Sequence, residues 1–146
     1  MVDHVSAICR ACYFQLRQLR VVLLSLTSEA ATSLVHAFIS CRLDYCNALL
    51  YGIADCQLQR LQSAQNAAAR LVTGLRRTEH IMPILKSLHW LPIRQRVTYK
   101  LATLVHKCVN GRAPEYLAEF CHPNVDRRPG MRSADSGKRL TNVLTN

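Results

Sequence analysis

The stretch Asp55–Thr73, DCQLQRLQSAQNAAARLVT, decides the fold class of this chain. Its apolar side chains recur every three or four residues, at Leu58, Leu61, Ala64, Ala68, Leu71 and Val72. That spacing places them on one face of an α-helix and leaves polar residues such as Gln59 and Asn66 on the other. Asp55 is expected to cap the start of this helix, and Gly74 to end it. The alanines leave little side-chain bulk, so we expect another helix to approach it closely.

The residues before this stretch show helical periodicity as well. A first helix is predicted from the apolar positions spread over residues 5–26, with Arg10 and Arg17 on an opposite, basic face. Thr27 or Ser28 is expected to cap a second helix.

The second predicted helix is expected to end near Gly52, because glycine favours the backbone conformation that stops a helix. Its apolar stripe includes Phe38 and Tyr45, which are therefore expected to be buried. Arg42 falls between them in the stripe, so we expect its guanidinium to have a structural partner, a carboxylate or a helix C-terminus.

Prolines mark the helix starts further along the chain, because a proline suits the first helical position. Pro83 is expected to begin a short helix over residues 84–88, and Pro92 a long helix over residues 93–110. Pro114 is expected to start a last short turn.

The sequence therefore predicts an all-α fold, a small helical bundle of about four main helices plus short helical turns. We expect this bundle to occupy residues 1–121 and to be followed by a basic, largely disordered tail over residues 122–146. The side chains expected to be buried are Leu16, Leu19, Phe38, Tyr45, Leu61, Ala68, Leu101 and Leu104.

Charge is the strongest indication of a partner. The 146 residues include 19 Lys and Arg but only 9 Asp and Glu, giving a net charge of +10. Such an excess favours a polyanion, and we expect sequence-independent contacts with the phosphates of RNA or DNA. Aromatic residues are few, and Trp90 and Tyr99 are the main candidates for stacking on bases. The expected contact residues are Arg76, Arg77, Arg96, Lys100, Lys107, Arg127, Arg128 and Arg132.

Other classes of function find little support in the residues. The longest uninterrupted apolar run has four residues, so no membrane span is expected. Seven cysteines without a visible signal peptide indicate free thiols and an intracellular protein. The pair Cys9 and Cys12 has metal-ligand spacing, but no second close pair completes a zinc site. Carboxylates are scattered, so we expect no catalytic site, no metal or other cofactor and no small-molecule substrate.

Four runs of sequence resemble signatures of jockey-like non-LTR (LINE-type) retrotransposon polyproteins. They are ISCRLDYCNALLYG (Ile39–Gly52), LQSAQNAAARLV (Leu61–Val72), LKSLHWLPIR (Leu85–Arg94) and GRAPEYL (Gly111–Leu117). The runs occur in the same order as in that family, and the resemblance covers residues 3–135.

The resemblance implies the thumb of a reverse transcriptase and the extension beyond it. In that family the thumb is helical and holds the template–primer duplex, whereas the palm with its Y/F-x-D-D carboxylates lies upstream and is absent here. Met1 falls within what resembles the first thumb helix, so we expect a fragment or a degenerate reading frame without polymerase activity. The expected function is weak, sequence-independent nucleic-acid binding; the alternatives are an inert product and, third, an independent metal or thiol enzyme.

Overall fold

The computed structural model describes residues 1–121, and every regular element in that part of the chain is helical. The predicted all-α class is therefore confirmed. The chain divides into two compact units, Met1–Thr98 and Tyr99 onward. The predicted tail, with Arg127, Arg128 and Arg132, lies outside the described residues.

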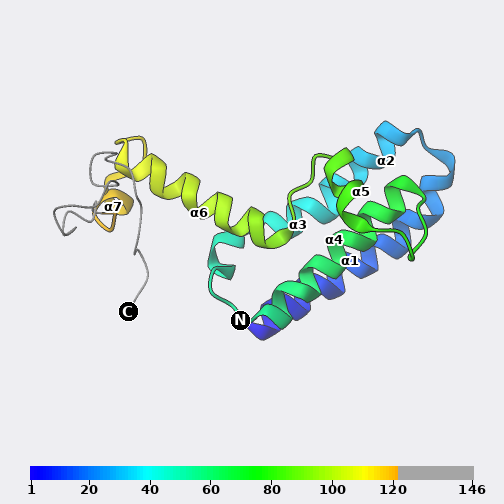
Figure 1. The fold of residues 1–146 in the computed structure, drawn as a ribbon, viewed down its shortest axis with the longest axis horizontal. Coiled ribbons are helices and arrows are strands. Elements are labelled where there is room, and N and C mark those ends of the chain that lie inside the picture. The colour runs from blue at the N-terminus through cyan, green and yellow to red at the C-terminus, as the bar shows by residue number, and fades with distance from the viewer. Residues whose placement is uncertain (122–146) are drawn as a thin grey trace. The chain divides into compact units, whose positions relative to one another are not determined.

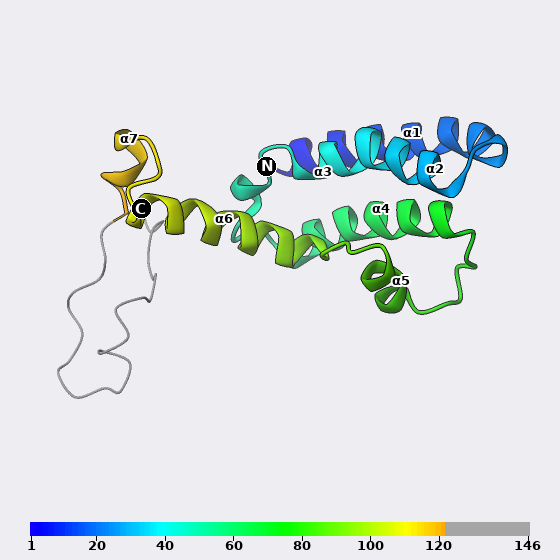
Figure 2. The ribbon, with the colours of Figure 1, turned by 90° about the horizontal axis from the view of Figure 1, so that it is seen from above.

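Three helical segments form the body of the first unit. The helix α1 (Val2–Val22) and the helix α4 (Asp55–Thr73) lie side by side and run in the same direction (Figure 1). Between them in sequence, α2 (Ser28–Val35) and α3 (Cys41–Asp44) run back in the opposite direction (Figure 2). This up-down-up order allows the apolar faces of all three segments to meet in one core.

Two of the predicted helix boundaries, Thr27 and Gly74, are confirmed, whereas the predicted cap at Asp55 is wrong. Thr27 caps α2, since its hydroxyl oxygen accepts a hydrogen bond from the Ala30 amide at 3.3 Å. Gly74 ends α4 in the left-handed conformation, with φ of 70°. Asp55 does not cap α4; Ala54 holds that position without a side-chain bond, and Asp55 is the first helical residue. A carboxylate there still favours the helix, because the first turn carries partial positive charge.

A π-helical turn over His36–Ser40 joins α2 to α3 and changes which side chains face the core. The buried apolar residues on this segment are Ala31, Val35, Ile39 and Leu43, at intervals of four, and Ser40 is buried beside Ile39. In an ordinary α-helix, residues four apart drift steadily around the helix axis. The π turn has more residues per turn, so here such residues stay on the side that faces the core.

The prediction for this second helix was wrong in three respects. Phe38 is 41% exposed and Tyr45 is 69% exposed, because the core-facing stripe passes through Ile39 and Leu43 instead. Arg42 is also exposed and needs no buried partner. The helix ends at Asp44, and a 3₁₀ turn (Asn47–Leu50) precedes Gly52.

Small residues bring α1 and α4 together in the core. Ala64, Ala68 and Ala69 of α4 are fully buried, which allows the close approach expected from the sequence. Leu16, Leu19 and Leu61 are also buried, as predicted. The largest cluster of buried apolar residues draws on every helix of the first unit; its members from α1 and α4 are Val5, Cys9, Cys12, Leu16, Leu19, Leu58, Leu61, Ala64, Ala68 and Ala69.

The remaining helices are shorter or span the two units. Helix α5 (Ile81–Ser87) packs on α4 and begins two residues before Pro83, which is tolerated because first-turn amides lack intrahelical acceptors. Helix α6 (Ile93–Val109) begins in the first unit and continues into the second, which also contains α7 (Glu115–Ala118).

Leu101 and Leu104 are half-buried rather than buried, which corrects the prediction for them. Both belong to the second unit, whose described part consists of the end of α6, the short α7 and their connection. These elements offer little apolar surface, and Cys108 is the one side chain between residues 99 and 121 that is buried.

Replacing Leu61 with alanine tests the importance of the α1–α4 core. Leu61 is 1% exposed, so Leu61→Ala is expected to lower the free energy of unfolding by about 2–5 kcal/mol. Leu49→Ala is the matched control; Leu49 is 63% exposed, and its loss should change stability by less than about 0.5 kcal/mol. Urea titrations followed by circular dichroism measure both, and equal effects would contradict this description of the core.

Candidate nucleic-acid interface

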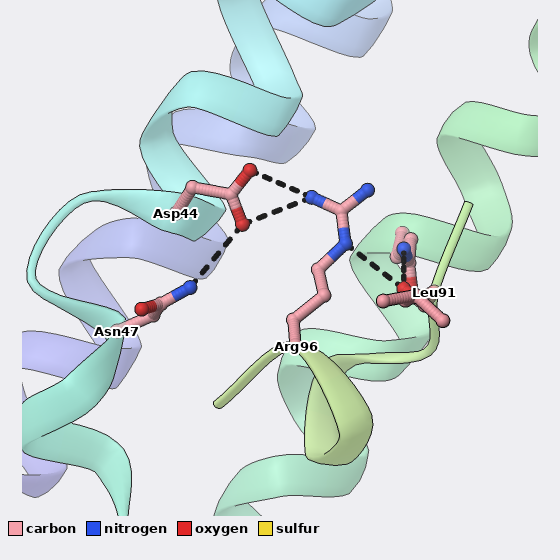
Figure 3. Close-up of polar contacts among 5 residues, drawn as sticks. Asp44, Asn47, Leu91 and Arg96 are labelled. Carbon is pink, nitrogen blue, oxygen red and sulfur yellow. Dashed lines mark hydrogen bonds and ion pairs between the residues drawn. The ribbon is translucent and has the colours of Figure 1, made fainter. Parts of the chain in front are cut away.

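Arg96, one of the expected phosphate contacts, is engaged within the fold. Its Nη1 donates to both carboxylate oxygens of Asp44 at 2.9 and 2.8 Å, and its Nε donates to the Leu91 carbonyl oxygen at 2.9 Å. Asn47 supports Asp44 through a bond of 3.3 Å (Figure 3). The Arg96 side chain is only 12% exposed. Arg96 therefore joins the first turn of α6 to the end of α3.

Two glutamines on α4 bind the backbone of Leu91 and Ile93, at the start of α6. Gln65 is 1% exposed, and its Nε2 donates to the Leu91 carbonyl oxygen at 2.8 Å. Gln62 accepts a hydrogen bond from the Ile93 amide at 2.9 Å and donates to the Gln65 side-chain oxygen at 2.9 Å. We call the set Asp44, Gln62, Gln65, Leu91 and Arg96 the Leu91 junction.

The sequence contains one sign of this junction that helical periodicity does not capture. Gln65 stands beside Ala64 and three residues before Ala68, both on the apolar face of α4. A long amide next to such positions is buried only if its polar atoms find partners, and here they are backbone and side-chain groups. Its partner Leu91 is 26 residues away and was not identifiable from local patterns.

The other expected contact residues that the structure describes lie on the surface. Arg76 and Arg77 are exposed in the loop after α4, where the Arg76 amide donates to the Glu79 carboxylate at 3.3 Å. Lys100 and Lys107 are exposed on the part of α6 that belongs to the second unit. The structure therefore supports an exposed position for these four and an internal role for Arg96.

Ion pairing neutralises little of the positive charge. Within residues 1–121 the ion pairs are Arg96 with Asp44 and Arg94 with Asp55, and both side chains of the second pair are largely exposed. Exposed pairs of this kind contribute little to stability. The exposed cations outside these pairs are Arg10, Arg17, Arg20, Arg42, Arg60, Arg76, Arg77, Lys86, Lys100, Lys107 and Arg112.

The two expected stacking residues differ in accessibility. Trp90 is 6% exposed and meets the His36 ring edge-on, with ring centroids 6.2 Å apart. It therefore packs in the core and cannot receive a base without local unfolding. Tyr99 is 66% exposed.

The cysteines are free thiols, and three of them are buried: Cys9 and Cys12 in the core, and Cys108 in the second unit. Burial, followed by the neighbouring Cys9 thiol, raises the pKa of Cys12 to about 11, although the charge of Arg42 opposes this shift. Burial also raises the pKa of Cys9. In the described part of the chain, no three His, Cys, Asp or Glu side chains come together as a metal site would require. Cys9 and Cys12 act as small apolar core residues.

Comparisons with family models, with curated proteins and with solved structures find no match to this chain. Among the described helices, none has the length and apolar character needed to cross a bilayer. The function is therefore inferred from the charges and contacts of the chain itself.

Arg96→Ala is expected to destabilise the fold far more than Arg94→Ala. The first change removes charge-assisted hydrogen bonds at the Leu91 junction and should cost about 2 kcal/mol. The second removes an exposed pair and should cost less than about 0.5 kcal/mol. Urea unfolding measures both, and a double-mutant cycle with Asp44→Ala isolates the Arg96–Asp44 coupling. Equal losses for the two arginines would show that the junction does not stabilise the fold.

Alkylation by iodoacetamide at pH 8 should distinguish the thiols. Cys41, Cys46 and Cys56 are exposed and should react readily, whereas Cys12 is buried and its pKa of about 11 leaves almost no reactive thiolate. The raised pKa also stabilises the folded state below pH 9, and this contribution is lost as the pH rises through about 11. Mass spectrometry of peptides reports each site, and concentrated urea should make the rates converge. Rapid modification of Cys12 in the folded protein would contradict its placement.

Proposed function

We propose that this chain is a non-catalytic helical protein fragment that binds RNA or DNA through phosphate contacts, weakly and without reading sequence. The observation that carries the proposal is the exposed surplus of positive charge after folding. Folding pairs Arg94 and Arg96 with carboxylates, but it leaves Arg76, Arg77, Lys100 and other cations at the surface. Such a basic surface binds nucleic acid favourably because its cations release the counterions condensed on the phosphates.

We further propose that the chain derives from the thumb and post-thumb region of a jockey-like non-LTR retrotransposon reverse transcriptase. Three of the four runs that carry the resemblance meet at the Leu91 junction: Asp44 comes from the first, Gln62 and Gln65 from the second and Leu91 from the third. The second and third runs are in direct contact, and Arg96, two residues after the third run, joins Leu91 to Asp44 of the first; these contacts support an origin in one folded unit. An upstream reading frame encoding Y/F-x-D-D in the surrounding genome would test the origin directly, and an unrelated upstream frame would count against it.

Salt dependence tests the proposed binding. If four to six phosphates are engaged, the logarithm of the affinity should fall against the logarithm of salt concentration with a slope of about −3 to −5. Dissociation constants should be on the order of 10⁻⁴–10⁻⁶ M at physiological salt. Fluorescence anisotropy with labelled RNA and DNA oligonucleotides of unrelated sequence measures both quantities.

Charge-removing variants identify the residues that bind phosphate. Arg76→Gln with Arg77→Gln, and separately Lys100→Gln with Lys107→Gln, should each flatten the slope by about one unit for every phosphate that the variant no longer binds. Arg94→Gln is the matched control, because Arg94 is already paired with Asp55. Absence of binding even at low salt would refute the proposal and leave an inert product. An unchanged slope in both double variants would exclude these four residues and direct attention to Arg127, Arg128 and Arg132.

A further inference from the structure

The outer face of α1 combines cations with exposed aromatic rings. Phe14 is 56% exposed and Tyr13 is 40% exposed, and Arg10 and Arg17 beside them are also exposed. Every Phe and Tyr side chain in residues 1–121 is at least 40% exposed, so what distinguishes these two rings is their position between two arginines on one helix. Phe14 lies opposite the α1 residues that contact the core, such as Cys12 and Leu16, whereas Tyr13 lies at the edge of that buried face.

Helical geometry brings these four side chains onto one strip. At 100° per residue, Arg10, Tyr13, Phe14 and Arg17 fall within an arc of about 100°. Arg10 and Arg17 are about 10 Å apart along the axis, with both rings between them. The strip continues to Arg20 at its C-terminal end, and Asp3, the one carboxylate of α1, lies about 10 Å before Arg10.

We propose that this strip, the α1 platform (Arg10, Tyr13, Phe14, Arg17), is a binding site for single-stranded nucleic acid. Bases stack on Phe14 and Tyr13, while Arg10 and Arg17 contact the flanking phosphates. The inference rests on the proposed nucleic-acid binding and deepens it by naming the class of ligand. Aromatic residues interleaved with cations are the pattern by which proteins hold single strands without reading sequence.

The composition of the platform favours a single strand over a duplex. In a duplex the bases are already stacked on one another, so exposed rings gain nothing from it. Arginine and aromatic side chains are also enriched in protein–protein interfaces, so a second copy of the chain is the competing occupant of the platform. A single strand carries negative phosphates, which complement Arg10 and Arg17. It also carries unstacked bases, which complement the rings of Tyr13 and Phe14.

Three probes with the same number of phosphates separate stacking from charge. They are a thymidine 12-mer, an abasic 12-mer with the same backbone, and a duplex with the same phosphate count. The unmodified 146-residue chain should bind the thymidine strand at least about fivefold more tightly than the abasic strand, because stacking on an aromatic side chain strengthens binding by about that factor or more.

Phe14→Leu removes the ring but keeps an apolar, helix-compatible side chain. It should weaken binding of the thymidine strand at least about fivefold and leave the abasic strand and the duplex unchanged. Phe14→Tyr should retain the binding of the parent. Phe120→Leu is the matched control, since Phe120 is 71% exposed but follows Glu119 and has no cation within one helical turn. Circular dichroism of each variant verifies that helicity is kept.

Ultraviolet cross-linking of the unmodified chain to the thymidine strand supplies a second, independent measurement. The cross-linked peptide should contain Tyr13 or Phe14. No binding of any probe would overturn the proposed function and the platform together. Binding of all three probes with equal affinity, unaffected by Phe14→Leu, would overturn the platform alone. Self-association that Phe14→Leu abolishes would likewise overturn it, in favour of a second copy as the occupant.

Discussion

The carbonyl oxygen of Leu91 is the point on which the first unit depends. It accepts hydrogen bonds from both Gln65 on α4 and Arg96 on α6, and Arg96 in turn binds Asp44 at the end of α3. A carbonyl with two lone pairs is fully satisfied by two such donors. Removing either donor leaves the carbonyl with a single partner, and removing Arg96 also leaves Asp44 with only the hydrogen bond from Asn47.

The Leu91 junction also explains why one cation on α6 differs from its neighbours. Arg96 and Lys100 are four residues apart and have similar positions on the helical wheel. Arg96 finds a carboxylate and a carbonyl within reach, and its planar guanidinium binds both at once. Lys100 remains exposed. Charge geometry along one helix therefore does not separate a fold-stabilising arginine from a cation that is available to a ligand.

Local patterns in the sequence predicted where the helices lie. They predicted the buried face of α4 correctly, but not that of the second predicted helix or the contacts of the Leu91 junction. Leu61 and Ala68 were correctly placed because α4 is a regular helix, for which spacing alone determines the buried face. Phe38 was misplaced because it lies within the π turn, where the residues per turn differ from those of an α-helix, and no residue type marks such a turn. The Leu91 junction escaped prediction because its partners come from three separate segments. On α1 the spacing of Arg10 and Arg17 indicates a basic face, but it does not single out Phe14 between them as an exposed ring.

The long sequence separations at the junction have a consequence for folding. The Arg96–Asp44 contact spans 52 residues, and the Gln65–Leu91 contact spans 26. Closing such loops costs chain entropy before any contact is formed, so these bonds are expected to form after the helices and the neighbouring turns. The buried alanines of α4 can meet α1 before then, since that contact needs no ion pair. During synthesis the ribosome releases Asp44 well before Arg96, and the Asp44 carboxylate must remain solvated until its partner emerges.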